Sequence, residues 1–271
     1  MKSAKLNLAT RYYRTLPITR MGYETETVEL DPRRTALVAL HCWDIGCDGG
    51  PAIDPNYYVG MGTLDSYREA VRILQECVRP AIDAARRAGV LVCHVEHPAI
   101  AAQFPQSREA VDPPPPAAVP AEPPRPRAVP GHVERMVART FGQDYDTKSP
   151  YARMGRAKIV EPLPAEPVVY QTGQFDRILR QRGIENLIYS GFAADMCILR
   201  APGGAEPMFG FGYRQFLLRD ATVGVEFPDS FPDRVATRWA VRYFESRLGN
   251  GLLTRDFITA CGAVAPANRA K

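Results

Sequence analysis

Apolar residues along the chain follow two spacings, one typical of buried strands and one typical of helices. Helical spacing of apolar residues runs over 71–85. A capping-box pattern at Ser66 and Glu69 predicts the start of this helix, and Gly89 predicts its end. Pro80 predicts a kink or a restart within it. Further helices are predicted over 174–182, around Phe141 and after Asp233. Short apolar runs predict strands at 35–41, 90–95, 168–170, 186–190 and 215–218.

This alternation of strands and helices predicts a parallel sheet covered on both sides. We therefore expect an α/β fold, a three-layer sandwich with a mainly parallel sheet. The length of 271 residues suits one such domain, placed at 31–260, with an N-terminal arm over 1–30 and a tail over 261–271. In such sheets, functional residues gather beyond the carboxyl ends of the strands.

Proline is the unusual feature of the composition, with 25 residues, many of them between Asp112 and Pro130. A run of prolines cannot hold a helix or donate backbone hydrogen bonds, so 112–130 is predicted to be an extended insertion at the surface. A partner that recognises proline-rich segments is the alternative explanation for it.

Charge and hydropathy narrow the class of protein. The net charge is +4, from 34 basic and 30 acidic residues that are scattered along the chain, so we expect no nucleic-acid partner. No run of 18 apolar residues predicts a membrane span, and the polar first 23 residues lack a secretory signal pattern, so a cytoplasmic location is expected. The six cysteines show no CxxC spacing, and we expect neither disulfides nor a zinc finger.

The strongest chemical signal is the segment from Ser190 to Cys197, where an apolar strand enters a small-residue turn and a cysteine follows. At a helix N-terminus the macrodipole and free N–H groups favour a thiolate, which predicts a lowered pKa for Cys197. The same N–H groups can stabilise an oxyanion on an attacked carbonyl. Cys197 is thus a candidate nucleophile; a buried structural cysteine is the alternative.

Several segments resemble the isochorismatase-like cysteine hydrolases. The resemblance spans roughly 33–248 without the insertion, and the run from Gly191 to Cys197 is its most specific part. It implies a sheet of about six strands with helices on both faces, a homo-oligomer, and hydrolysis of amide-like C–N bonds, or of an enol ether, by an Asp–Lys–Cys triad. The matching segments are ARRAGVLVCHV, ILRQRGIENLIYSGFAADMCI and GYRQFLLRDATVGVE.

The resemblance assigns one member of that triad. Cys197 matches the nucleophile, and the backbone N–H groups of Met196 and Cys197, after a cis peptide near Ala193, would form the oxyanion hole. His41 stands where the family has its aspartate, and no lysine follows the third strand, where the chain reads Tyr170-Gln171-Thr172; Lys158 lies upstream.

His41 has three interpretations. It is a general base that takes the thiol proton, because a neutral imidazole accepts a proton near physiological pH. It is a hydrogen-bonded polar group in a site that has lost its activity. Or it is a metal ligand.

Polar residues at the predicted strand ends complete the candidate site. Trp43, Asp44, His94 and Gln171 are expected to line the substrate cleft. His94, Glu96 and His97 lie where nicotinamidases of this family bind a metal in a D-x-H-P pattern. Imidazoles and carboxylates suit zinc, so these three are weak metal candidates beside the interpretation of a hydrogen-bonded cleft wall. No cofactor is expected.

The sequence therefore favours a cysteine-dependent hydrolase of a small amide, imide or ureide-like substrate, acting through a covalent acyl-enzyme on Cys197 with His41 as base. The rival hypothesis is a non-catalytic relative that keeps the pocket as a binding or scaffold protein. A third hypothesis is metal-dependent chemistry on the histidines.

Overall fold

A mainly parallel sheet forms the centre of the molecule in a computed structural model, which describes residues 5–58, 60–113 and 127–264. Six strands run parallel in the order β8-β7-β6-β3-β4-β5, and a hairpin of β1 and β2 extends the sheet beyond β8. The α/β prediction is confirmed, with eight strands in place of about six. The parallel strands are β3 (Thr35–Leu40), β4 (Leu91–Val95), β5 (Val168–Val169), β6 (Asn186–Gly191), β7 (Arg214–Leu218) and β8 (Gly249–Leu252).

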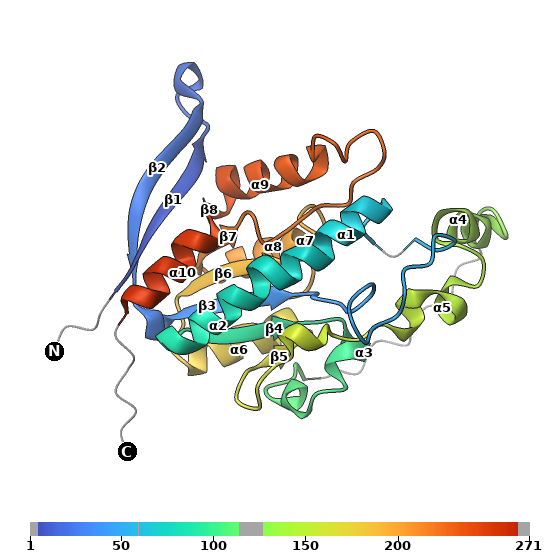
Figure 1. Ribbon diagram of the computed structural model, residues 1–271, viewed down its shortest axis with the longest axis horizontal. Helices are drawn as coiled ribbons and strands as arrows, with labels where there is room; N and C mark the ends of the chain where they lie inside the picture. The colour runs from blue at the N-terminus through green and yellow to red at the C-terminus, as the bar shows by residue number, and fades with distance from the viewer. Residues whose placement is uncertain (1–4, 59, 114–126, 265–271) are drawn as a thin grey trace.

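The two additional strands come from the N-terminal segment. β1 (Leu6–Arg14) and β2 (Gly22–Leu30) pair antiparallel along their whole length, and Arg11 pairs with Gly251 of β8. The hairpin stands out from the body of the molecule (Figure 1). Its base buries Leu6 and Leu8, which fixes the hairpin to the core.

Helices cover both faces of the sheet, because the side chains of a buried strand alternate between two cores. Leu37 and Ala39 of β3 belong to one core, and Val38 and Leu40 belong to the other. The first core is covered by α1 (Leu64–Ile73), α2 (Arg79–Ala88) and α10 (Thr254–Ala263). The second core is covered by α6 (Thr172–Gln181), α7 (Cys197–Arg200), α8 (Ala205–Phe209) and α9 (Val235–Arg247).

The helix predicted over 71–85 is longer and has an irregular middle. It begins with Thr63, whose hydroxyl accepts the Ser66 N–H at 3.1 Å, so the capping residue lies three positions before the one predicted. A π-helical turn, Leu74–Val78, joins α1 to α2, and Pro80 lies in the first turn of α2. The predicted restart at this proline and the predicted end at Gly89 are confirmed.

Short helices complete the structure, and α4 (His132–Phe141), with no buried residue, lies at the far end of the molecule from the termini (Figure 1). The central part of the proline-rich insertion, 114–126, lies outside the described residues. The remaining short helices are η1 (Ile18–Arg20), η2 (Pro32–Arg34), α3 (Pro98–Ala101), η4 (Pro105–Arg108), α5 (Tyr145–Lys148), η5 (Pro150–Arg153) and η6 (Lys158–Val160).

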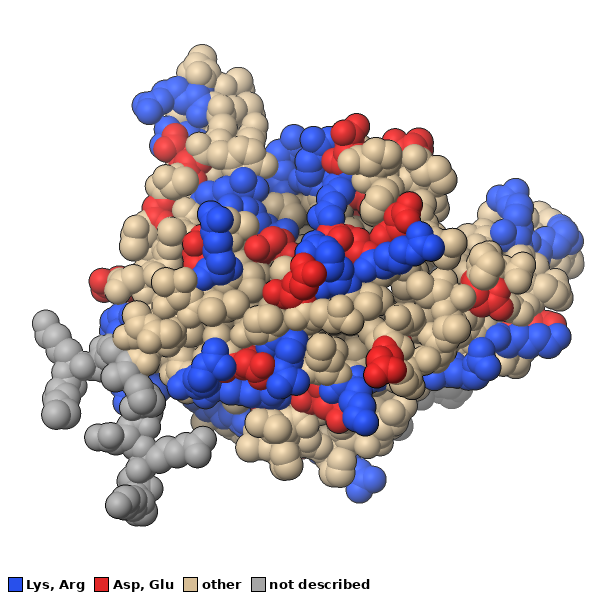
Figure 2. Space-filling view, in the orientation of Figure 1, with Lys and Arg blue, Asp and Glu red and all other residues tan. Residues whose placement is uncertain are grey.

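Charged side chains on the visible face are intermixed by sign (Figure 2). Arg72 illustrates the pattern, since it bridges Glu69 and Glu76 on the same helical surface. Within the described residues, every helix is too short or too polar to cross a lipid bilayer.

Candidate functional site

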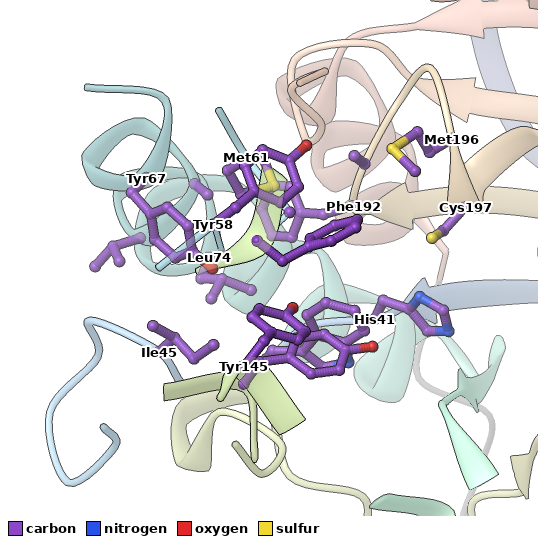
Figure 3. A pocket seen from close by; sticks show the side chains of 17 residues that line it. His41, Ile45, Tyr58, Met61, Tyr67, Leu74, Tyr145, Phe192, Met196 and Cys197 are labelled. Carbon is purple, nitrogen blue, oxygen red and sulfur yellow. The ribbon is translucent and has the colours of Figure 1, made fainter. Parts of the chain in front are cut away.

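The candidate site is a pocket beyond the carboxyl ends of β3 and β6, where a parallel sheet is expected to bind its ligand. Its volume is about 290 Å³. Cys197 and His41 lie at one end of it, and Ile45, Tyr67 and Leu74 lie toward the other end (Figure 3). The structure thus brings together the two residues proposed for catalysis from the sequence.

Aromatic rings form much of the wall. Successive ring contacts link His41 to Trp43 (5.0 Å between centroids), Trp43 to Tyr151 (5.4 Å) and Tyr151 to Tyr145 (5.4 Å). The series continues through Phe141 to Tyr58, at 5.2 and 5.6 Å. The pocket is therefore bounded by an arc of rings that begins at His41, and Phe192 adds a further ring.

The pocket carries no fixed charge in the part of the chain that the structure describes. Its lining contains no aspartate, glutamate, lysine or arginine side chain. Burial, together with His97 and Arg156 nearby, lowers the pKa of His41 to about 3. Its imidazole is therefore neutral at physiological pH, and it is a much weaker base than the ordinary imidazole expected from the sequence. An ionic ligand would lose its hydration here without gaining a counter-charge.

Cys197 is positioned by the turn after β6. The strand ends at Gly191, the peptide bond from Phe192 to Ala193 is cis as the resemblance implied, and Cys197 begins the one-turn helix α7. Burial raises the pKa of the Cys197 thiol, and the Asp195 carboxylate raises it further, although a backbone hydrogen bond from Ala193 opposes the shift. The lowered pKa predicted from the helix start is thus wrong, because burial of the sulfur is the largest influence on it.

Backbone donors near the sulfur are partly in use. The Met196 N–H donates to the Ala193 carbonyl at 3.2 Å, and the Ile198 N–H donates to the same oxygen at 3.1 Å. Among the described residues, the Cys197 N–H has no acceptor. Of the two N–H groups that the resemblance placed in an oxyanion hole, the Cys197 N–H is therefore the one available to a ligand.

His41 is held in an unusual conformation. Its φ of 47° lies in the left-handed region, which a non-glycine residue seldom adopts. Its backbone N–H donates to the Val95 carbonyl at 2.9 Å, and its ring stacks on Trp43 with an interplanar angle of 21°. The buried Nδ1 has no hydrogen-bond partner among the described residues.

Two tyrosines lie near the thiol, and the sequence alone did not identify either of them as a site residue. Burial raises the pKa of Tyr58 to about 12 and also raises that of Tyr151, and in both cases the Cys197 thiolate would raise it further. Their hydroxyls therefore stay protonated and share the sulfur's environment. No short motif marks these residues, which lie in connecting segments far apart in the sequence.

The other predicted substrate contacts lie elsewhere, except for Trp43, which lines the pocket. An Asp44 carboxylate oxygen accepts the Gly155 N–H at 2.8 Å, and the Gln171 side-chain oxygen accepts the Asp112 N–H at 2.7 Å. His94 is fully buried, with its Nε2 2.9 Å from a Glu166 oxygen. These three polar groups serve the surrounding loops.

The weak metal candidates do not converge. His94 pairs with Glu166, Glu96 pairs with Arg156, and the His97 Nδ1 accepts the Ala99 N–H at the start of α3. Among the described residues, no three histidine, cysteine, aspartate or glutamate side chains are grouped as metal ligands. Lys158 is exposed at the start of η6 and does not line the pocket.

Solved structures with this architecture are known. A cysteine hydrolase from Pseudomonas syringae pv. phaseolicola 1448A matches with a TM-score of 0.51 and 16% sequence identity, over 87% of this chain and 96% of that one. An isochorismatase family protein from Desulfovibrio vulgaris subsp. vulgaris str. Hildenborough matches with a TM-score of 0.51 and 17% identity, over 85% and 99%. No protein-family model and no curated protein sequence matches the chain.

At identities this low, the structural matches show the fold alone, and the activity has to be argued from the site. The resemblance drawn from the sequence is confirmed at that level. The chain has the α/β fold of these cysteine hydrolase and isochorismatase-family structures.

Proposed function

We propose that the protein is a cysteine hydrolase of small neutral amide-like substrates. The observation that carries the proposal is the shared location of Cys197 and a neutral His41 at one end of the pocket (Figure 3). A nucleophile beside a proton acceptor, with a free backbone N–H nearby, meets the requirements of acyl transfer.

The mechanism follows from these groups. The Cys197 sulfur attacks the carbonyl carbon while its proton passes to His41, and the Cys197 N–H stabilises the oxyanion. The protonated His41 then donates to the departing nitrogen, the C–N bond breaks, and a thioester remains on Cys197. Water attacks the thioester, its proton passes through His41 back to the sulfur, and the acid product leaves.

The lining defines the substrate. With no charged side chain and an arc of rings, the pocket suits an uncharged amide, imide or ureide with a bulky apolar or flat group. The thiol is protonated at rest because burial raises the pKa of Cys197. Proton transfer must therefore accompany attack on a bound carbonyl.

The test compares two cysteines. The purified protein is assayed against neutral carboxamides, imides and ureides, and intact-protein mass spectrometry looks for an acyl adduct. Cys197→Ala should reduce hydrolysis by about 10³-fold or more and abolish the adduct, since the covalent route needs the sulfur. Cys77→Ala is the matched control, because Cys77 is also partly buried but does not line the pocket. Equal activity in the Cys197→Ala protein would refute the proposal.

A second candidate function is binding without turnover. Two observations favour it: the raised pKa of Cys197 and a pocket lining without aspartate or lysine among the described residues. A binding protein would change its tryptophan fluorescence with neutral amides, through Trp43 in the wall, yet form no adduct and release no product. The adduct measurement therefore separates the two functions.

A further inference from the structure

Behind the pocket wall lies a buried ion pair that the proposed mechanism does not use. The side chains of Glu96 and Arg156 form a salt bridge, and both are completely buried. Glu96 directly follows β4, and the Arg156 Nε donates to the Val160 carbonyl at 2.9 Å. Neither residue lines the pocket.

This pair connects to the catalytic end of the pocket through one ring. The Trp43 indole N–H donates to Glu96 Oε2 at 3.2 Å. The same indole ring stacks on the imidazole of His41. A hydrogen bond to the indole N–H restricts rotation of the ring about its side-chain bonds, in addition to the ring contacts with Tyr151 and His41. The carboxylate therefore helps to fix the plane against which the imidazole lies.

Stability alone does not account for this ion pair. Removing two charges from water costs free energy that their attraction often fails to recover, and apolar replacements of similar size are commonly neutral or stabilising. The backbone here is already fixed, because Trp43 pairs with Arg156, and the Ala157 N–H donates to the Cys42 carbonyl at 2.9 Å. The Arg156 Nη2 also has no partner among the described residues.

We propose that Glu96 and Arg156 are positioning residues that hold His41 toward the pocket through the Trp43 ring. This inference rests on the proposed function only for its catalytic consequence; the geometric claim stands on its own. Burial raises the pKa of Glu96, and Arg156 opposes that rise and holds the side chain in place, while Glu96 accepts the indole N–H. Because the His41 Nδ1 has no hydrogen bond among the described residues, stacking on Trp43 is what confines the imidazole ring.

The test removes the pair without stranding a charge. In Glu96→Leu/Arg156→Leu, the His41 ring signals in NMR, assigned with His41→Gln, should shift and broaden, and the Trp43 indole N–H should exchange faster with solvent. Glu96→Gln keeps an oxygen acceptor for the indole, so it should preserve the wild-type Trp43 signal. Glu166→Leu/Arg86→Leu is the matched control, because it removes the other carboxylate–arginine pair near β4. It should leave the His41 signals unchanged.

Activity then adds a second readout. The Glu96→Leu/Arg156→Leu protein should lose about 10-fold or more in kcat, since a misplaced catalytic group reduces the rate steeply. In a protein that already carries His41→Ala, the same two substitutions should cause no further loss of kcat. Unchanged His41 signals in the folded double variant would overturn the inference, whatever the activity. Altered His41 signals in a protein that hydrolyses no amide would instead refute the proposed function and leave the positioning role supported.

Discussion

Two histidines lie beside two carboxylate–arginine pairs, one fully buried and one partly exposed, and only one of the two histidines borders the pocket. Burial lowers the pKa of both His41 and His94 to about 3. His94 bonds directly to Glu166, which Arg86 also holds, whereas His41 touches the other pair only through Trp43. The lowered pKa therefore does not distinguish the two histidines, because both are buried. Contact with the pocket is what marks His41 as the candidate functional residue.

The sharpest way to test this comparison is to replace each imidazole. His41→Gln should lower kcat/KM by about 10² to 10⁴-fold, the usual contribution of general acid–base catalysis. His94→Gln should change it by about threefold or less, because His94 does not reach the pocket. Steady-state kinetics on the best amide would measure both, and equal losses would break the comparison.

The carboxylates should differ in stability. Glu96→Ala strands the fully buried Arg156 charge and should cost about 3–5 kcal/mol in the free energy of unfolding. Glu166→Ala should cost less, about 1–3 kcal/mol, because the Arg86 side chain is 21% exposed and turns to water. Urea unfolding would measure both values. A larger loss for Glu166→Ala would show that His94 is the more tightly coupled histidine.

Per pH unit, the smallest effect is a shared sensitivity to acid. Both histidines have a folded pKa below the unfolded value of 6.5, so the unfolded chain binds protons first as the pH falls. Stability present at pH 7 is therefore lost between about pH 6.5 and 3, with a slope approaching about 1.4 kcal/mol per pH unit for each histidine. His94→Gln should remove about half of this slope between pH 6.5 and 5 in urea titrations. An unchanged slope would show that the two imidazoles are not equivalent.

Much of the fold was predictable because its central strands are buried on both faces. Strands such as β3 and β6 read as continuous apolar runs, which is the pattern of a covered parallel strand. β8 was missed because its sequence, GNGL, carries no apolar run, and the β1–β2 hairpin was missed because half of its residues face solvent. Short strands, and strands with one face exposed to solvent, form mainly because neighbouring strands pair with them, and local sequence spacing does not reveal that pairing.

The site was predictable only where a local motif marks it. Cys197 follows a strand in a small-residue turn, and His41 and Trp43 follow another, so position alone identified them. The Glu96–Arg156 pair joins residues 60 positions apart, and no spacing rule connects them. Tyr58 lies in a loop and Tyr151 in the short helix η5, both in connecting segments where tertiary contacts decide which side chains meet.

One stretch of surface chain, from α4 through η5, supplies Phe141, Tyr145 and Tyr151 to the pocket. The sulfur and the imidazole come from the rigid ends of β6 and β3. In the proposed hydrolase, one part of the recognition surface is therefore encoded separately from the reacting groups. Mutations in that one stretch can change which molecules are accepted while the chemistry is inherited intact, which gives this architecture a simple route to new specificities.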